Sequence, residues 1–421
     1  MRVLFVTIPE NTHLYSMVPT AWAFWAAGHE VRVASTPSLT DTITRTGLTA
    51  VPVGKDSDIH TGTTANREAQ ETETVSWSDL DAANLDWETE LTRFQYGAWG
   101  FAYYNDPLMD DLVAYARHWR PDLVVWDALS YAGGIAAHAI GVPHARFLSF
   151  SDVWGAKRRL FLDLLDKQPA DRREDPFADW LGGKAREYGK GFAEELVTGH
   201  WTIDQLPERL TVRAAKLRLP VRFTPYNGPA VIPDWLREPT TRRRVCLSLG
   251  TANTERFGGD YVSKMDIFDA LSDLDVEVVA ALLPAQRDEL GTLPDNARVV
   301  QSVPLHALLP SCSAAVHHGG FGTYTCAVHF GVPALALATP VADQVFRCQR
   351  LAESGAGIYV PHTKVSAEII REKVGLLLSD PSYTTAAKRL RDEAAAHPTP
   401  YQLVPACEQL ARGMSASAHA G

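Results

Sequence analysis

The amino-acid sequence predicts an α/β protein of two doubly wound domains. The chain has 421 residues, which is more than a single core usually organises. Short β-rich runs alternate with helix-like segments in two series, separated by Tyr226–Trp235, which contains two prolines and a glycine. We therefore expect residues 1–220 and 241–400 to form the two domains, with 221–240 as the linker and 401–421 as a C-terminal helix with a frayed tail.

Each series has the order of a doubly wound sheet. In the first half we expect strands at Arg2–Ile8, Glu30–Ala34, Thr49–Val53, Leu123–Trp126 and His144–Leu148, with helices at Met17–Ala27, Leu39–Thr46, Leu108–His118 and Ser130–Ala139. In the second half we expect strands at Val245–Leu249, Val276–Ala281, Ala314–His317 and Ala334–Leu337. The polar, acidic segment Asp56–Glu90 interrupts the first series and is expected to be irregular. Open parallel sheets bind ligands at the carboxyl ends of their strands, so we look for functional residues there.

Composition excludes several classes of protein. The formal net charge is −10 and no basic stripe stands out, so nucleic-acid binding is not expected. No apolar run approaches the roughly 18 residues of a membrane span, and the start MRVLFVTIPE lacks the long apolar stretch of a signal peptide. The five cysteines are odd in number and have no CxxC spacing, which argues against a disulfide framework or a zinc site. We expect a cytoplasmic protein.

Two polar residues stand at the carboxyl ends of predicted strands in the first half. His13 closes the loop that begins at Pro9, and this loop has no glycine with which to form a dinucleotide-binding turn. A histidine at this position can take a proton from a hydroxyl, or it can be a helix-capping or core residue. Asp127 follows the strand Leu123–Trp126 directly. It can orient an imidazole and stabilise its protonated form, or it can cap the next helix.

The strongest local signal is a glycine-rich turn between a buried strand and a helix. Its residues are His317, His318, Gly319, Gly320, Phe321, Gly322 and Thr323. Glycines at a helix N-terminus expose backbone N–H groups where the helix dipole favours a phosphate, and the His318 and Thr323 side chains add donors. An ordinary tight turn is the alternative.

Two further strand ends carry small or polar residues. Thr251 ends the run Leu247-Ser248-Leu249-Gly250-Thr251. The small residues of this run allow the backbone to approach a ligand closely, although an ordinary tight turn is the alternative. Asp343 and Gln344 follow the strand Ala334–Leu337. Adjacent acid and amide groups suit sugar hydroxyls, although a helix cap has the same appearance.

Over nearly its whole length the chain resembles the inverting GT-B glycosyltransferases of the bacterial antibiotic type, which decorate macrolide, anthracycline and related polyketides. The most specific block is VPLHALLPSCSAAVHHGGFGTYTCAVHFGVPALAL with ADQ after it, which resembles the family's donor-binding region. The blocks THLYSMVPTAWAFWAAGHEVRVAS, RPDLVVWDALSYAG and YNGPAVIPDW resemble the family's opening, its acid-bearing strand and its entry into the second domain. The resemblance implies two Rossmann-like domains that face a cleft.

The resemblance also implies roles for individual residues. His13 matches the catalytic base and Asp127 its partner. His318, Gly322 and Thr323 match donor diphosphate contacts, with Gly319 and Gly320 in the same turn and Thr251 at a phosphate-proximal position. Asp343 and Gln344 match sugar-hydroxyl contacts. The nucleobase loop Ser302-Val303-Pro304 departs from the family, because Ser302 stands where an aromatic residue often stacks on the base.

The implied activity is transfer of a deoxysugar from a dTDP-sugar to a hydroxyl of a polyketide aglycone or its glycoside. No cofactor and no metal are expected. WTIDQLPERL followed by YNGP resembles a subgroup in which several enzymes depend on an auxiliary protein related to cytochrome P450. A non-catalytic GT-B scaffold and a sugar-nucleotide epimerase are the alternatives. The oligomeric state stays open, with a homodimer among the alternatives.

Overall fold

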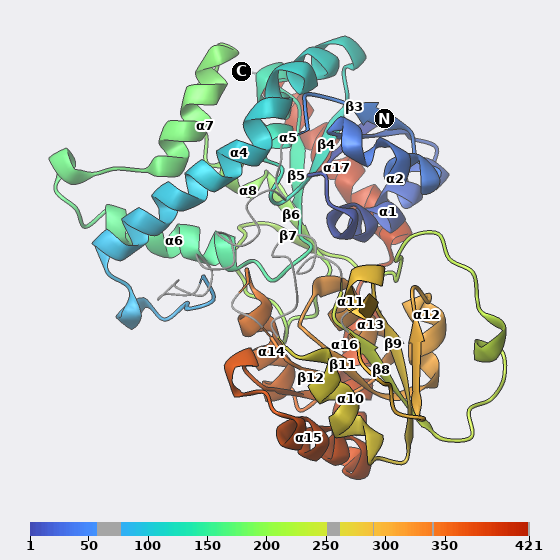
Figure 1. Cartoon of the computed structure of the whole chain (residues 1–421). Helices are drawn as coiled ribbons and strands as arrows, with labels where there is room; N and C mark the ends of the chain where they lie inside the picture. Colours follow the sequence, from blue (N-terminus) through green and yellow to red (C-terminus); the bar gives the residue numbers. More distant parts are fainter. Residues whose placement is uncertain (57–76, 251–261, 289, 339–340, 420–421) are drawn as a thin grey trace.

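Two parallel sheets organise the chain (Figure 1). The structure is a computed structural model that describes residues 1–56, 77–250, 262–288, 290–338 and 341–419. The first sheet consists of β1 (Arg2–Val6), β2 (Glu30–Ser35), β3 (Ala50–Pro52), β4 (Leu123–Asp127), β5 (His144–Phe147), β6 (Trp201–Asp204) and β7 (Arg218–Pro220). The second consists of β8 (Arg243–Ser248), β9 (Val276–Ala281), β10 (Ala297–Val300), β11 (Cys312–His317), β12 (Ala334–Ala336) and β13 (Gly357–Tyr359).

Helices connect the strands of both sheets. Around the first sheet are α1 (Asn11–Ala26), α2 (Thr40–Arg45), α4 (Trp87–Trp119), α5 (Tyr131–Ile140), α6 (Val153–Leu165), α7 (Pro176–Glu187) and α8 (Glu195–Thr198). Around the second are α10 (Lys264–Ser272), α11 (Pro284–Asp288), α12 (Leu305–Leu308), α13 (Phe321–Phe330), α14 (Gln344–Glu353), α15 (Ala367–Ser379) and α16 (Pro381–Ala395). Single 3₁₀ turns lie at Pro37–Leu39, Ala82–Asn84, Ala170–Arg172, Asp234–Leu236, Leu309–Ser311 and His362–Lys364.

The strand order confirms the doubly wound prediction in both halves. The first sheet runs β3-β2-β1-β4-β5-β6-β7 and the second β10-β9-β8-β11-β12-β13, and every recorded pair is parallel. The order reverses between β1 and β4 in the first sheet and between β8 and β11 in the second. Ligands of open α/β sheets bind at such switch points, outside the carboxyl ends of the strands.

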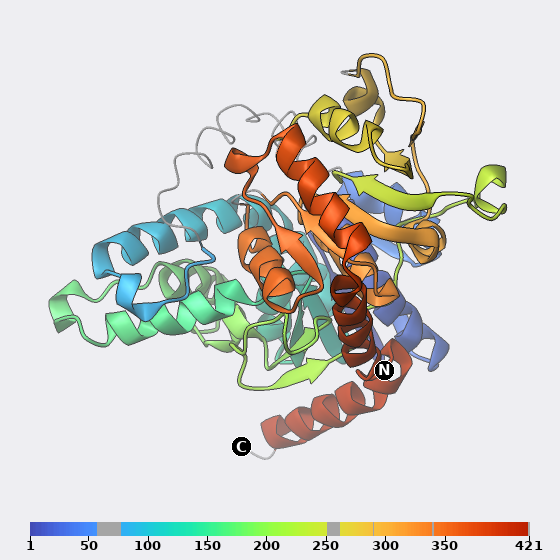
Figure 2. The ribbon, with the colours of Figure 1, turned by 90° about the horizontal axis from the view of Figure 1, so that it is seen from below.

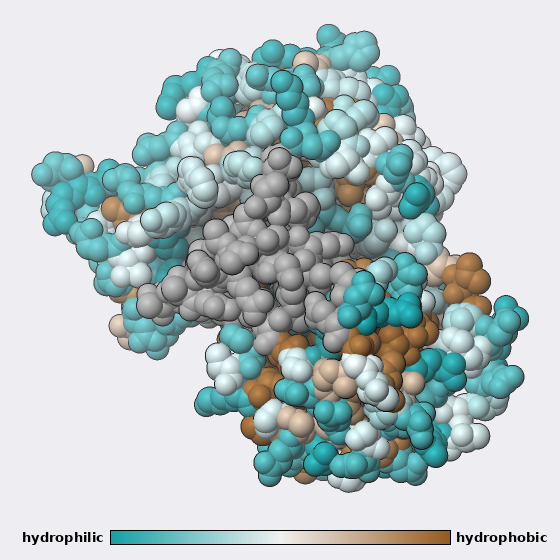
Figure 3. Space-filling view, viewed as in Figure 1, coloured by the Kyte–Doolittle hydropathy of each residue, from teal (hydrophilic) through white to brown (hydrophobic). Residues whose placement is uncertain are grey.

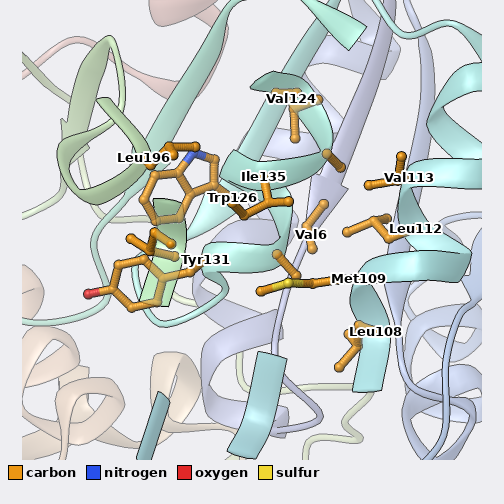
Figure 4. Close-up of a cluster of buried hydrophobic side chains, with 14 of the residues drawn as sticks. Val6, Leu108, Met109, Leu112, Val113, Val124, Trp126, Tyr131, Ile135 and Leu196 are labelled. Atoms are coloured by element: carbon orange, nitrogen blue, oxygen red, sulfur yellow. The ribbon is translucent and has the colours of Figure 1, made fainter. Parts of the chain in front are cut away.

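Apolar residues that alternate along the strands build the core on both faces of the first sheet. Val6, Val124 and Trp126 point to one face, where they meet Leu112 of α4 and Ile135 of α5 (Figure 4). These side chains are fully or almost fully buried, and each contributes about 1.5–3 kcal/mol through its removal from water. The packing fixes β1 and β4 side by side, and it therefore fixes whatever stands at their ends.

Helix α4 differs from the sequence prediction, which placed a helix only at Leu108–His118. It begins at Trp87, where Asp86 caps it by accepting from the Thr89 amide, and it continues through Pro107. A proline inside a helix removes one hydrogen bond, but burial of one whole face of α4 against α5 and the sheet outweighs that loss. The predicted irregular segment Asp56–Glu90 lies largely outside the described residues, and its last residues, from Trp87, belong to α4.

The C-terminal helix α17 (Pro400–His419) returns to the first sheet (Figure 2). Its residues Leu403, Val404 and Cys407 are buried in the core beneath α1. The helix predicted within 401–421 is confirmed and extends to His419, while the frayed tail remains a prediction. The last helix of the chain therefore ties the second half of the sequence to the first domain.

Candidate active site

We expected His13 to lie in a loop. It lies instead in the first turn of α1, because this helix begins at Asn11. Its Nδ1 is 2.8 Å from Oδ2 of Asp127. A carboxylate can only accept, so Nδ1 carries the proton and Nε2 is left as a proton acceptor. The His13 side chain is 15% exposed, whereas that of Asp127 is fully buried. Of the two residues, only His13 is therefore accessible from outside the protein.

Asp127 is the last residue of β4 and not the residue after it. Its Oδ1 accepts from the Leu129 amide at 3.0 Å, and its Oδ2 accepts from the Ser149 hydroxyl at 3.2 Å. The cap residue of α5 is Ser130, so the alternative reading of Asp127 as a helix cap is wrong. The Leu129 amide and the Ser149 hydroxyl therefore hold this carboxylate in place against the imidazole of His13.

Ser149 is a member of this cluster that the sequence analysis missed. Its hydroxyl lies 3.2 Å from both His13 Nδ1 and Asp127 Oδ2. It follows β5, the neighbour of β4, so its place at a third strand end was the signal that could have identified it. Serine is common in loops, and nothing in the local sequence distinguishes this one.

The glycine-rich turn joins β11 to α13 at the switch point of the second sheet. Gly319 has φ +92°, in the left-handed region that favours glycine, and its amide donates to Nδ1 of His317 at 2.9 Å. Gly320 is the cap residue of α13 and offers no side chain to the first amides of the helix. These amides have no acceptor within the helix, so they remain available to an anion.

Glycines also create the space that the His318 ring occupies. A Cβ on Gly250 would lie 2.5 Å from its Cε1, and a Cβ on Gly320 would lie 2.7 Å from the same atom. Burial, followed by the charge of Arg347, lowers the pKa of His318 to about 4, so the ring is neutral at pH 7. The Thr323 hydroxyl lies 3.3 Å from that of Ser248 at the end of β8. Thr251, just beyond β8, lies outside the described residues.

The remaining predicted donor residues also lie at strand ends. Ser302, Val303 and Pro304 connect β10 to α12, with Ser302 exposed and the other two buried. Asp343 precedes α14, and Gln344 is the first residue of that helix. Both are buried, and the Asp343 carboxylate makes no capping bond to α14.

Asp343 instead connects the two domains. Its Oδ2 accepts from the Ser151 amide at 2.6 Å, and its Oδ1 lies 3.1 Å from Nη2 of Arg347. Burial raises the pKa of Asp343, and Arg347 and the Ser151 amide oppose that rise. Ser151 belongs to the same short loop as Ser149, so this loop touches the His13–Asp127 pair at one end and the donor side at the other.

The linker makes a second connection between the two strand-end clusters. A Cβ on Gly228 would lie 2.8 Å from the Tyr15 hydroxyl of α1, so the linker passes close against that helix. Next to it, the side-chain oxygen Oδ1 of Asn227 lies 3.8 Å from the Cys326 sulfur. The side-chain nitrogen Nδ2 of Asn227 lies 3.7 Å from the position that a Cβ on Gly322 would take. The N-terminal half of α1 and the start of α13 therefore meet at one junction.

Three buried histidines predict that the protein loses stability when it is acidified. Burial lowers the pKa of His144 well below its ordinary value, that of His317 to about 3 and that of His318 to about 4. In the unfolded chain each imidazole has a pKa of about 6.5. Below that pH the unfolded state binds more protons than the folded state, so the free energy of unfolding falls as the pH falls. We expect a loss of about 2 kcal/mol per histidine by about pH 5.

Urea unfolding followed by circular dichroism at neutral pH and at about pH 5 measures this effect. His144 Nδ1 accepts from the Trp126 indole at 3.0 Å, so His144→Asn keeps an acceptor while removing one titrating group. This variant should lose less stability between the two pH values than the wild type, because one of the titrating imidazoles is gone. Identical unfolding midpoints at the two pH values would contradict the prediction.

The described residues hold no group of three or more histidine, cysteine or acidic side chains placed to bind a metal ion. Within the same residues, no helix has the length and apolar character that crossing a bilayer requires. On the face shown in Figure 3, hydrophilic residues cover most of the first domain.

Comparison with known proteins identifies the family of this chain. Residues 22–250 and 265–410 match the N-terminal and C-terminal domains described as erythromycin biosynthesis protein CIII-like. The chain is 46% identical to the 10-deoxymethynolide desosaminyltransferase of Streptomyces venezuelae, over 98% of this chain and 97% of that protein. It is 41% identical to the aclacinomycin-T 2-deoxy-L-fucose transferase of Streptomyces galilaeus, over 97% and 96%.

Among solved structures, the glycosyltransferase VinC in complex with dTDP superposes with a TM-score of 0.89 at 41% identity, over 98% of this chain and all of that one. The spinosyn forosaminyltransferase SpnP superposes with a TM-score of 0.82 at 36% identity, over 98% and 99%. The fold is therefore GT-B, and the chain belongs to the erythromycin biosynthesis protein CIII-like family of glycosyltransferases.

Proposed function

We propose that this glycosyltransferase moves a deoxysugar from a dTDP-sugar to a hydroxyl of a polyketide antibiotic aglycone or its glycoside, with inversion at the anomeric carbon. The observation that carries the proposal is the 2.8 Å contact between His13 and Asp127 at the switch point of the first sheet. The named relatives act on macrolide and anthracycline compounds, and VinC was crystallised with dTDP. A non-catalytic scaffold needs no such pair, and the relatives are named as transferases, not epimerases.

The chemistry is a single displacement. Nε2 of His13 takes the proton of the acceptor hydroxyl as its oxygen attacks the anomeric carbon. The bond from that carbon to the donor diphosphate breaks at the same time, and its electron pair leaves with the diphosphate. Attack opposite the leaving group inverts the anomeric configuration. Asp127 stabilises the imidazolium that forms on His13.

Negative charge grows on the leaving diphosphate, and the turn before α13 is suited to receive it. We assign the diphosphate to the turn Gly319–Thr323 and its free amides, with His318, Thr323 and Thr251 as side-chain contacts and Ser302–Pro304 beside the base. Preorganised amides at a helix N-terminus stabilise such charge without reorganisation. We accordingly propose a metal-independent reaction with no cofactor.

We retain Asp343 and Gln344 as the proposed contacts to the sugar hydroxyls. The Asp343 carboxylate already accepts from the Ser151 amide. A sugar hydroxyl would have to share or replace that bond, while the ion pair with Arg347 can remain.

Aromatic residues next to the His13–Asp127 pair support an apolar acceptor. Phe150 directly follows Ser149 and packs edge-on against Trp154, with ring centroids 6.3 Å apart. Trp154 in turn contacts Phe101 of α4 at 5.9 Å and Trp77 at 4.3 Å. Large flat side chains of this kind bind apolar ring systems with little loss of conformational freedom.

Products identified by mass spectrometry and NMR test the proposal. Purified protein is incubated with a panel of dTDP- and UDP-sugars and polyketide aglycones, with and without a cytochrome P450-like auxiliary protein. Dependence on such an auxiliary protein and a homodimeric state both remain part of the proposal. We expect a glycoside of inverted anomeric configuration from a dTDP-deoxysugar. Release of free sugar alone, or a changed sugar nucleotide without transfer, would contradict the proposal.

A further inference from the structure

Arg347 of α14 is a buried cation directly beneath the glycine-rich turn. Its side chain is only 3% exposed. Nη2 donates to the carbonyl oxygen of Gly319 at 2.9 Å and lies 3.1 Å from the Asp343 carboxylate. The guanidinium carbon stands 5.3 Å from the ring of Phe321 and 5.2 Å from that of Tyr324. The side chain is thus fixed on three sides, at the start of α13.

The hydrogen bonds of this guanidinium are incomplete. Within the described residues, Nε and Nη1 of Arg347 are buried and have no hydrogen-bond partner. An arginine stays charged at any pH that proteins tolerate, and buried donors are normally paired. Nδ1 of the neighbouring His318 is also buried without a partner. Two unsatisfied buried groups beside free helix amides point to this turn as a place that suits an anionic ligand.

A purely structural role explains only part of this arrangement. The contacts to Gly319 and Asp343 use Nη2, and a lysine or an amide side chain could make either of them. A planar guanidinium is suited to holding several acceptors at once, including phosphate oxygens. The unpaired Nε and Nη1 are the donors that a structural role leaves unexplained.

We propose that Arg347 is a positioning residue for the donor diphosphate. By holding the Gly319 carbonyl, it keeps the turn in the conformation that directs the amides of Gly320–Gly322 to the diphosphate. Its fixed positive charge adds to the field of the α13 N-terminus. Through Asp343 and the Ser151 amide, it also ties the turn to the loop that carries Ser149. The inference rests on the proposed function, because it takes a nucleoside diphosphate as the ligand.

Calorimetry with dTDP and with thymidine tests this role. Arg347→Met keeps the length of the side chain and removes its charge and donors. We expect this variant to bind dTDP about 10–100-fold more weakly, because the turn loses the charge-assisted bond that holds the Gly319 carbonyl and the fixed positive charge beside the diphosphate. Thymidine has no phosphate, so its affinity should stay within about twofold of the wild-type value. Arg350→Met is the matched control, because Arg350 lies one turn away on the exposed face of α14 and pairs with Glu353.

The ligand pair separates the alternatives. Equal weakening of dTDP and thymidine, or dTDP affinity unchanged from the wild type, would overturn the role of Arg347. Failure of the wild-type protein to bind dTDP would instead overturn the proposed function. If Arg347→Met does not fold, Arg347→Lys carries the test, because lysine keeps a charge but lacks the Nε and Nη1 donors of the planar guanidinium. Wild-type dTDP affinity in that variant would likewise overturn the proposal.

Discussion

Replacing His13 with alanine is expected to lower kcat by about 10²–10⁴-fold, which is the contribution of a positioned general base. The donor turn belongs to the other domain, so the affinity for dTDP should remain within about twofold of the wild-type value. Steady-state transfer kinetics and calorimetry on the same preparation measure the two quantities. The acceptor KM should change little, because the base acts on the proton that moves in the transition state.

His118→Ala is the matched control. His118 lies on α4 with an exposed side chain, so its loss removes an imidazole without touching the proposed site. It should leave kcat unchanged. Turnover close to the wild-type value in His13→Ala would remove the proposed base from the mechanism. A parallel loss of dTDP affinity would show that the substitution had disturbed the junction of the domains instead.

The fold could be predicted because its signals are local. Strands such as Val276–Ala281 are apolar, and the glycines that follow α1 and α5 mark the ends of those helices, with Gly28 at φ +89° and Gly141 at φ +73°. The start of α4 could not be predicted in this way. Pro107 divides the helix in the sequence, and only tertiary burial of its face explains why it continues. The docking of α17 on the first domain likewise depends on a partner surface that is distant in sequence.

The candidate site divides along the same line. His13, Asp127 and the turn at Gly319 could be predicted because each stands at or just beyond the carboxyl end of a strand and carries residues suited to proton transfer or anion binding. Ser149 and Arg347 could not. Ser149 is one serine among many, and Arg347 stands inside a helix, where arginines usually face solvent. Their roles arise from contacts with His13, Asp127 and Gly319 that only the folded chain creates.

The two domains place different chemistry at equivalent positions. In the first, the switch point between β1 and β4 holds an imidazole and a carboxylate, which can exchange a proton. In the second, the switch point between β8 and β11 holds glycines and a helix N-terminus, which can bind an anion. The proposed mechanism therefore divides acceptor activation and donor binding between the sheets, and variants in one should leave the function of the other intact.

Asp127→Asn is expected to lower kcat by about 10²–10⁴-fold with little change in dTDP affinity. The amide has nearly the shape of the carboxylate, so the fold should persist. However, it cannot neutralise an imidazolium on His13, and its NH₂ group cannot accept from Nδ1, so the tautomer with a free Nε2 is no longer enforced. Kinetics, together with a melting temperature to confirm folding, measure the effect. Asp163→Asn, at an exposed position on α6, should be neutral.

The double variant His13→Ala/Asp127→Asn gives the sharper result. If Asp127 acts only through His13, removing the carboxylate costs nothing once the imidazole is gone, and the double variant should be no slower than His13→Ala alone. Fully multiplicative losses would mean that Asp127 acts on the substrates independently of His13. That result would contradict the proposal that the 2.8 Å contact between His13 and Asp127 is the basis of proton transfer, even if both single variants were slow.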